Sequence, residues 1–235
     1  MALSSFDYGF VDVARAALCQ QNNMDVISNN LANVSSSGFK ADRLSFSDLM
    51  EREVRHVMDQ GALHATENPL DLAIGGEGFF QVQTPNGVRL TRNGAFKMLS
   101  DGRLVTSQGF QVLGQGGAAI TLNPNGGLPY IDDQGGISQN GEQVGIIGLV
   151  KVADTNQLIK EGANLFAGPE GKPPVTTAAT DATLNQGYLE EANVEVVSEM
   201  VQMINTMRSY ESYQKVLQAM QEMDTKAVNQ VGRVG

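Results

Sequence analysis

Two apolar stripes at helical spacing, one near each end of the chain, constrain the fold more than any other feature. In the N-terminal stripe, apolar residues recur every three or four positions at Phe10, Val13, Ala17, Met24, Ile27 and Leu31. Gln20 is the one polar interruption. The spacing predicts a helix over about residues 6–34 that packs against another helix, because a lone helix cannot bury its own stripe.

The C-terminal stripe is wider, because it contains two apolar rows. The first row consists of Met200, Met203, Met207, Tyr210, Tyr213, Leu217 and Met220. The second row consists of Val194, Val197, Val201 and Ile204. Together they predict a helix from Asn193, as its N-cap, to about Val228. Such a wide apolar face can contact more than one neighbouring helix.

We expect both stripes to lie between subunits, because seams of this length exceed what one small β domain could cover. The residues expected at this subunit interface are Phe10, Val13, Ala17, Met24, Ile27, Leu31, Val197, Met200, Val201, Met203, Ile204, Met207, Tyr210, Leu217 and Met220.

The middle of the chain changes to short alternating segments separated by glycine turns. Asn-Gly or Asp-Gly pairs occur at positions 86–87, 93–94, 101–102, 125–126 and 140–141. Apolar residues alternate between them at Phe80 with Val82, Val88 with Leu90, Phe96 with Met98, and Leu104 near Phe110. This pattern predicts an antiparallel β domain, sandwich-like or an irregular barrel.

The predicted fold class is therefore α+β, with long terminal helices forming a coiled-coil-like layer and a central antiparallel β domain. The expected organisation is an N-terminal helix over residues 1–36, an extended linker over 37–67, the central β domain over 68–185 and a C-terminal helix over 186–235.

Composition excludes several classes of partner. The chain has 235 residues, of which 41% are hydrophobic, enough for a substantial core. Its 26 acidic and 16 basic residues give a net charge of −10, which repels phosphate backbones, so no nucleic-acid partner is expected. No segment approaches the roughly 20 apolar residues of a membrane span, so no membrane insertion is expected. The N-terminal residues show no cleavable signal peptide, and Cys19 is the single cysteine.

Structural roles explain the residue types that could otherwise take part in catalysis or binding. His56 and His64 lack metal-ligand spacing and are interpreted as solvent-facing or linker residues. The run at positions 75–78 lacks the Lys-Ser/Thr ending of a phosphate loop, which predicts a tight turn or bulge entering a strand. Glu190 and Glu191 are adjacent and diverge, so they are interpreted as solvated surface. We therefore expect no catalytic residue, cofactor, metal or small-molecule substrate.

Several motifs resemble the bacterial flagellar rod and hook family of axial proteins. Near the N-terminus they are residues 24–34, followed by Gly38-Phe39-Lys40. In the middle they are residues 68–74, 76–80, 91–96 and 101–106. Near the C-terminus they are residues 186–190, 193–194, 199–201 and 208–211. The resemblance covers nearly the whole chain, and it departs at residues 35–37, where three serines replace the family's Asn-Thr-Pro type of turn.

The resemblance implies a structural axial subunit that polymerises through its terminal helices and transmits torque. In this family the helices pack as an inner tube around an export channel and the β domain lies outside. The implied partners are other rod subunits, of the same and of related chains, and the flagellar type III export apparatus. The implied location is the periplasm-spanning rod of the basal body, reached by the unfolded chain without a cleavable signal peptide.

The length of one segment separates the members of the family. Distal rod proteins carry an extra linker after the N-terminal region, whereas here only Glu51 to Glu67 precedes the β domain, which favours the cell-proximal rod protein. The alternatives are a distal rod protein, or a non-catalytic ligand-binding β module that dimerises through its helices. With 6% aromatic residues and no tryptophan, the sequence offers little for a ligand pocket.

Overall fold

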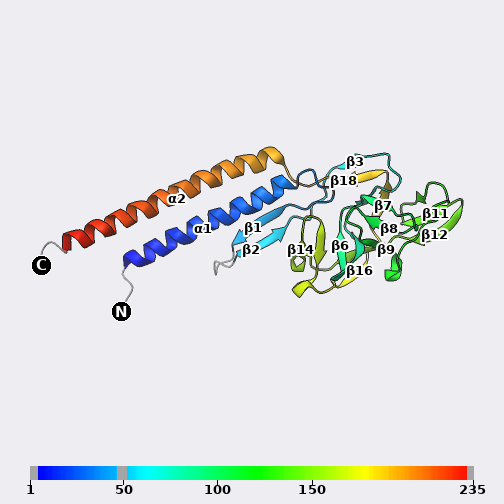
Figure 1. Ribbon diagram of the computed structural model, residues 1–235, viewed down its shortest axis with the longest axis horizontal. Coiled ribbons are helices and arrows are strands. Elements are labelled where there is room, and N and C mark those ends of the chain that lie inside the picture. The colour runs from blue at the N-terminus through cyan, green and yellow to red at the C-terminus, as the bar shows by residue number, and fades with distance from the viewer. Residues whose placement is uncertain (1–4, 47–51, 232–235) are drawn as a thin grey trace. The chain divides into compact units, whose positions relative to one another are not determined.

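The computed structural model describes residues 5–46 and 52–231 and has an α+β fold (Figure 1). Its long helices are α1 (Ser5–Ala32) and α2 (Val196–Val231). The strands up to the middle of the chain are β1 (Asp42–Phe46), β2 (Arg52–His56), β3 (Leu63–Ala65), β4 (Leu72–Gly75), β5 (Phe79–Thr84), β6 (Gly87–Thr91), β7 (Phe96–Met98), β8 (Leu104–Thr106) and β9 (Gln111–Leu113).

The later strands are β10 (Tyr130–Ile131), β11 (Gly136–Gln139), β12 (Glu142–Ile146), β13 (Leu149–Val152), β14 (Ile159–Glu161), β15 (Leu165–Ala167), β16 (Thr176–Ala178), β17 (Thr183–Gln186) and β18 (Tyr188–Glu190). Short 3₁₀ turns occur at η1 (Gln115–Gly117), η2 (Thr155–Gln157) and η3 (Pro169–Gly171). Among the residues that the structure describes, no helix combines the length and apolar character needed to cross a lipid bilayer.

The chain forms two compact units. The helical unit contains the described residues of 1–32, 44–53 and 195–235. The β domain contains residues 33–43 and 54–194. The segment between residues 37 and 67, predicted as an extended linker, contains β1, β2 and β3, and its residues are divided between the two units.

In the helical unit, α1 and α2 pack against each other in antiparallel directions (Figure 1). The Asn23 side-chain amide donates to the Thr206 hydroxyl at 3.3 Å, and the Asn30 amide donates to the Glu199 carboxylate at 3.4 Å. From the first pair to the second, the contact moves seven residues toward the C-terminus of α1 and seven residues toward the N-terminus of α2, as expected for antiparallel helices. The two predicted terminal helices are confirmed.

The predicted N-cap of α2 is wrong. The helix begins at Val196, and the Glu199 N–H donates to the Glu195 carbonyl at 3.0 Å, which places Glu195 at the start of the helix. The Asn193 side chain belongs to the β domain, where it accepts a hydrogen bond from the Ala41 N–H at 2.7 Å. Its amide donates to the carbonyls of Val57 and Asp59. Asn193 therefore joins distant loop segments.

The main sheet of the β domain is antiparallel and has the order β14-β15-β6-β5-β9-β8-β7, with β13 pairing with β5 and β16. Its central strand is β5, which pairs with β6, β9 and β13. The alternating segments predicted around Phe80, Leu90, Phe96 and Leu104 are confirmed as β5, β6, β7 and β8. The mostly antiparallel β domain is confirmed with them.

The structure also contains smaller sheets, with the orders β1-β2, β10-β11-β12, β17-β4 and β18-β3. The predicted Asn-Gly turns are well illustrated between β11 and β12. Asn140 and Gly141 have φ angles of 54° and 84°, the positive values that a type I′ hairpin turn requires at both central positions.

Successive side chains of β5 point to opposite faces of the main sheet, and each face contributes to an apolar cluster of the β domain. Phe80 and Val82 are fully buried in the larger apolar cluster, together with side chains such as Ile74 and Phe96. Phe79 points to the other face and packs with Leu90 and Phe166 in a second cluster. Because both faces of the sheet are covered, the β domain buries its own apolar strands.

Candidate functional site

The described part of α2 carries apolar side chains on two opposite sides. The side that faces α1 contains the buried Glu199 and Thr206 and continues with the half-buried Met203, Tyr210, Leu217 and Met220. The other side contains Val197, Met200, Val201, Ile204 and Met207, each between 51% and 72% exposed. At about 100° per residue, the mean directions of these two sides differ by about 140°. We call the second set the open face of α2.

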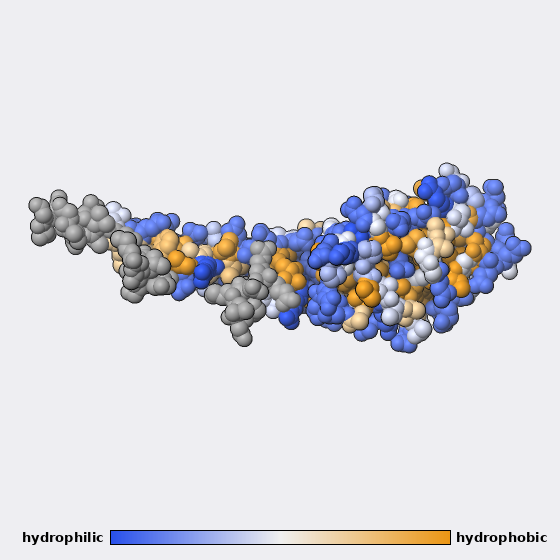
Figure 2. Space-filling model, turned by 90° about the horizontal axis from the view of Figure 1, so that it is seen from below, coloured by the Kyte–Doolittle hydropathy of each residue, from blue (hydrophilic) through white to orange (hydrophobic). Residues whose placement is uncertain are grey.

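The sequence spacing assigned Met200 and Met207 to the same row as Met203 and Tyr210, and this grouping is wrong. The α1 contact follows positions 199, 203, 206, 210, 213, 217 and 220 instead. The open face ends after Met207, because Arg208, Glu211 and Lys215 follow it on the same side. It therefore covers the first three turns of α2, and contiguous exposed apolar side chains of this kind mark protein–protein contacts. Figure 2 shows apolar side chains, in orange, along the helical unit.

The predicted residues of α1 lie mainly against α2. Ala17 and Ile27 are buried, whereas Phe10, Val13, Met24 and Leu31 are half-buried. On the outer side, Val11 is 44% and Leu18 is 57% exposed. These two residues were not predicted at an interface, although their seven-residue spacing places them on one side of the helix.

The β domain contains a buried cluster of three charged side chains, which we call the Glu190 cluster. Glu190 accepts from Lys40 Nζ at 2.6 Å and from Arg92 Nε at 2.9 Å, and the carboxylate is completely buried. Lys40 also donates to the Asp59 carbonyl at 2.6 Å, and Arg92 donates to the carbonyls of Gly76 and Gly78. Burial lowers the pKa of Lys40, and the charge of Glu190 opposes that shift.

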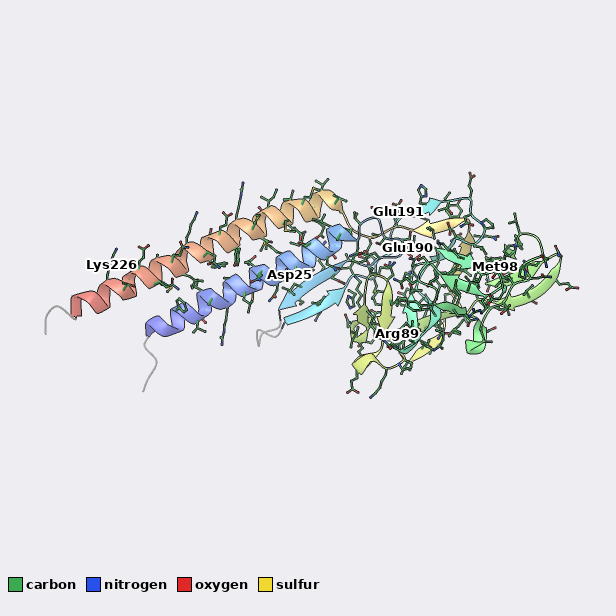
Figure 3. All side chains as sticks on the ribbon, viewed as in Figure 1. Asp25, Arg89, Met98, Glu190, Glu191 and Lys226 are labelled. Carbon is green, nitrogen blue, oxygen red and sulfur yellow. The ribbon has the colours of Figure 1, made fainter. Side chains whose placement is uncertain are left out.

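The interpretation of Glu190 as solvated surface is wrong, whereas its neighbour Glu191 is exposed (Figure 3). Backbone contacts explain the difference. The Gly38 N–H donates to the Glu190 carbonyl at 2.7 Å, and the Gly61 N–H donates to its carboxylate at 3.1 Å. Gly38 has a φ of 68°, and a Cβ there would lie 2.4 Å from the Arg92 carbonyl carbon. These contacts fix the backbone so that the Glu190 side chain points into the β domain and the Glu191 side chain points to its surface.

A second ionic cluster corrects the interpretation of His56. Its Nδ1 lies 2.7 Å from Asp42 Oδ1, and its ring packs edge-on against Phe166 at 5.7 Å. Lys160 donates to both Asp42 carboxylate oxygens and lies over the Phe39 ring at 3.6 Å. Burial alone would raise the pKa of Asp42, but the His56 hydrogen bond and the Lys160 charge outweigh it and hold that pKa below its ordinary value. His64 is exposed, as predicted.

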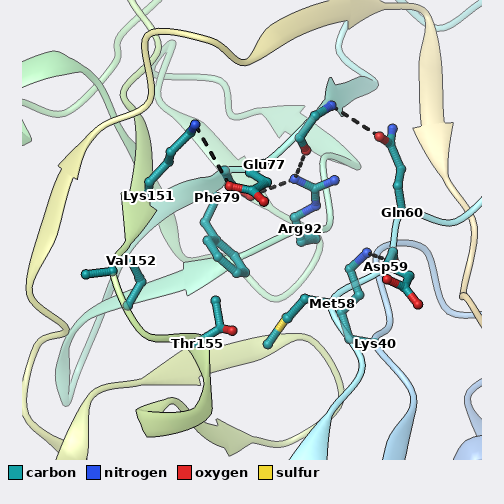
Figure 4. A pocket seen from close by; sticks show the side chains of 13 residues that line it. Lys40, Met58, Asp59, Gln60, Glu77, Phe79, Arg92, Lys151, Val152 and Thr155 are labelled. Carbon is teal, nitrogen blue, oxygen red and sulfur yellow. Dashed lines mark hydrogen bonds and ion pairs between the residues drawn. The ribbon is translucent and has the colours of Figure 1, made fainter.

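A cleft of about 460 Å³ lies beside the Glu190 cluster (Figure 4). Residues Gly76, Glu77 and Gly78 form one wall, and they make the turn between β4 and β5, so the turn predicted at positions 75–78 is confirmed. The cations in the wall have partners within the β domain: Arg92 bonds to Glu190, and Lys151 to Asp181 at 3.0 Å. Over residues 5–46 and 52–231, no group of three His, Cys, Asp or Glu side chains could hold a metal ion.

Three family models match separate parts of the chain. "Flagella basal body rod protein" matches residues 13–40, "Flagellar hook protein FlgE/F/G D1 domain" matches residues 73–139, and "Flagellar basal body rod FlgEFG protein C-terminal" matches residues 185–230. Each matched segment supplies one member of the Glu190 cluster: Lys40, Arg92 and Glu190 respectively.

Whole-length relatives agree with these models. The chain is 36% identical to flagellar basal-body rod protein FlgF of Caulobacter vibrioides, over 90% of this chain and 92% of that protein. It is 35% identical to FlgG of Buchnera aphidicola subsp. Schizaphis graminum, over 79% of this chain and 85% of that protein. It is 30% identical to FlgG of Bacillus subtilis, over 78% of this chain and 84% of that protein.

Proposed function

Because this chain belongs to the flagellar basal-body rod protein family, we propose that it is a structural subunit of the cell-proximal rod, which polymerises through its terminal helices and transmits torque. The open face of α2 carries this proposal. Five large apolar side chains remain 51–72% exposed there, although the opposite side of the same helix is covered by α1. Covering such a face with a neighbouring subunit gains hydrophobic free energy that the single chain lacks.

The helix spacing supports coiled-coil-like packing of α1 against α2 within each copy, and the open face of α2 would extend that packing to neighbouring copies. The contact side of α2 repeats at intervals of three and four residues, the pattern of helices that pack side by side. A contact between two different surfaces of one chain generates a helical filament when its rotation does not close into a ring. Such repeated contacts would transmit torque without any catalytic step.

The cell-proximal position rests on the sequence alone: only residues 51–67 precede the start of the β domain that the sequence predicts at residue 68, where distal rod proteins carry an extra linker. A distal position in the same rod is the alternative. We further propose that the chain reaches the basal body through the flagellar export apparatus as an unfolded polypeptide. A ligand-binding role has weaker support, because the charged groups Arg92 and Lys151 in the wall of the cleft already bond to the β domain itself.

The proposal is tested by placing charge on the open face. In Val201→Asp/Ile204→Asp, we expect the isolated chain to remain folded, because both side chains are exposed. We expect its incorporation into basal bodies, and swimming, to be lost, because a carboxylate buried in an apolar contact is strongly unfavourable. Electron cryotomography and immunoblotting of purified basal bodies measure incorporation in cells that lack their own copy.

The matched control is Gln218→Asp/Gln221→Asp, which adds the same two charges, also three residues apart, at exposed positions of α2 beyond the open face. This variant should enter the basal body normally. Normal incorporation of the double variant would refute the proposed role of the open face, whatever the control does.

A further inference from the structure

We propose that three segments of the β domain form a mechanical clamp that receives load from the helices, and that Asn193 is a positioning residue of this clamp. The segments are residues 38–42, 56–61 and 190–193, and we call them the root of the β domain. This inference rests on the proposed function, because it names the part of the β domain through which a rod subunit would transmit torque.

All covalent connections between the two units run through the root. The chain passes from one unit to the other after residues 32, 43, 53 and 194. The first two crossings lie on either side of residues 38–42, the third precedes residues 56–61, and the fourth follows residues 190–193. A load that travels along the chain from α1 or α2 therefore reaches the root before any strand of the main sheet.

The first and third segments of the root are bonded directly to each other. The Gly38 N–H donates to the Glu190 carbonyl at 2.7 Å, and Lys40 Nζ donates to the Glu190 carboxylate at 2.6 Å. The Ala41 N–H donates to the Asn193 side-chain oxygen at 2.7 Å. Because the residue numbers of both segments rise from the first bond to the last, the two segments run in the same direction.

The second segment closes the root, because it bonds to both of the others. The Val57 N–H donates to the Ala41 carbonyl at 2.8 Å. The Asn193 amide donates to the carbonyls of Val57 and Asp59 at 2.8 and 2.9 Å. This one neutral side chain thus uses its carbonyl oxygen for the first segment and its N–H donors for the second. Asn193 therefore fixes the spacing of all three segments.

The shared direction of the first and third segments decides how they respond to load. A pull transmitted from α1 acts on the N-terminal end of the first segment, whereas a pull transmitted from α2 acts on the C-terminal end of the third. In two parallel segments these ends lie at opposite ends of the bonded stretch, so opposed pulls slide one segment along the other. Sliding loads all the bonds together, whereas peeling breaks them one at a time, so the root should resist this direction of load most strongly.

The clamp is tested by pulling on single molecules of the full chain in optical tweezers. With handles at the two ends of the chain, the load enters the β domain through the root, and the unfolding step of this domain is identified by the length of chain that it releases. Asn193→Asp keeps the acceptor for the Ala41 N–H but replaces the donors to Val57 and Asp59 by a carboxylate oxygen that repels both carbonyls. We expect the β domain to unfold about tenfold faster at a given force.

Two controls separate a clamp from general stabilisation. In a Cys19→Ala background, handles on Asn86→Cys and Gln134→Cys, both at exposed turn positions of the β domain, apply load without passing through the root. In this direction Asn193→Asp should change the unfolding rate by less than about threefold. With handles at the chain ends, Asn125→Asp adds the same charge at an exposed position outside the root and should leave the rate unchanged.

The outcomes distinguish the clamp from the rod function. A tenfold effect in the end-to-end direction alone supports the proposal. Equal acceleration in both directions would show that Asn193 only stabilises the domain, and no acceleration from end to end would show that its bonds carry no load. Either result overturns the clamp and leaves the rod function intact. If circular dichroism shows that Asn193→Asp does not fold, Asn193→Ser takes its place in both directions. Absence of the unsubstituted chain from basal bodies would instead overturn the proposed function.

Discussion

The β domain encloses Phe80, Val82 and Leu90 completely, whereas the helical unit leaves Val197 72% exposed. The β domain also neutralises its buried charges internally, as Lys40, Arg92 and Glu190 demonstrate. The helical unit covers only one side of each helix. The difference indicates that the β domain is stable through its own contacts, and it supports the proposal that neighbouring subunits cover the remaining apolar surface of the helical unit.

The largest expected effect comes from removing the carboxylate of the Glu190 cluster. In Glu190→Ala, the buried Lys40 and Arg92 lose their shared counter-charge, so we expect a loss of about 3–5 kcal/mol in the free energy of unfolding. Chemical denaturation followed by circular dichroism measures it. The matched control is Glu191→Ala at the exposed neighbouring position, which should change stability by less than about 0.5 kcal/mol. Equal effects of the two substitutions would remove the claim that the β domain depends on this cluster.

A pair of isoleucine substitutions compares the two units directly. Ile74 is fully buried in the β domain, and Ile204 is 51% exposed on the open face. Ile74→Ala should destabilise the isolated chain by about 2–5 kcal/mol through the cavity that it leaves. Ile204→Ala should change the same free energy by less than about 0.5 kcal/mol. A large loss in isolated Ile204→Ala would mean that the helical unit already covers this side chain.

Replacing a glycine by alanine should change the free energy of unfolding in opposite directions in the two units. A Cβ at Gly94 would lie 1.8 Å from the Leu72 carbonyl oxygen, so Gly94→Ala should cost about 1–3 kcal/mol through overpacking. In α1, a Cβ at Gly9 would meet Met220 at an ordinary 3.4 Å. Gly9→Ala should therefore stabilise the helix by about 0.5–1 kcal/mol. Thermal unfolding of both variants measures whether stability rises or falls. Destabilisation by Gly9→Ala would show that Met220 packs too closely on α1 to accept a methyl group at position 9.

The smallest effect concerns acid stability of the β domain. The pKa of Asp42 in the folded chain is lower than the ordinary value of 3.8. At a pH between the pKa of Asp42 in the folded chain and its ordinary value, Asp42 is protonated in the unfolded chain but not in the folded chain. Protonation therefore favours unfolding, and stability falls as the pH drops below 3.8. Asp42→Asn should lack this part of the acid sensitivity. The difference in unfolding temperature between the two chains, followed from about pH 5 to pH 3, should narrow with acid, and a constant difference would contradict the assignment.

Local patterns predicted most of the fold. The three-and-four spacing placed both helices, and the alternation of Phe80 with Val82 placed the central strand, because each pattern lies within a few residues of sequence. The two helical rows were grouped incorrectly at Met200 and Met207, since the choice of contact side depends on α1. Local reasoning could not supply that information.

The Glu190 cluster could not be predicted for a related reason. Its members come from three segments, and Lys40 and Glu190 are 150 positions apart. Glu190 and Glu191 are the same residue type in adjacent positions, and tertiary contacts, among them those of Gly38 and Gly61, distinguish them. His56 was misinterpreted similarly, because its partner Asp42 belongs to another strand. Long-range ion pairs leave no periodic signal in a single sequence.

The 150-residue separation between Lys40 and Glu190 also makes the domain sensitive to the completeness of its own chain. A polypeptide that stops before position 190 would carry two cations destined for the interior and no anion to accompany them. Because such a fragment would have to bury Lys40 and Arg92 without their counter-charge, we expect it to stay open and accessible to proteases. One carboxylate near the end of the β domain thereby distinguishes finished molecules from truncated ones.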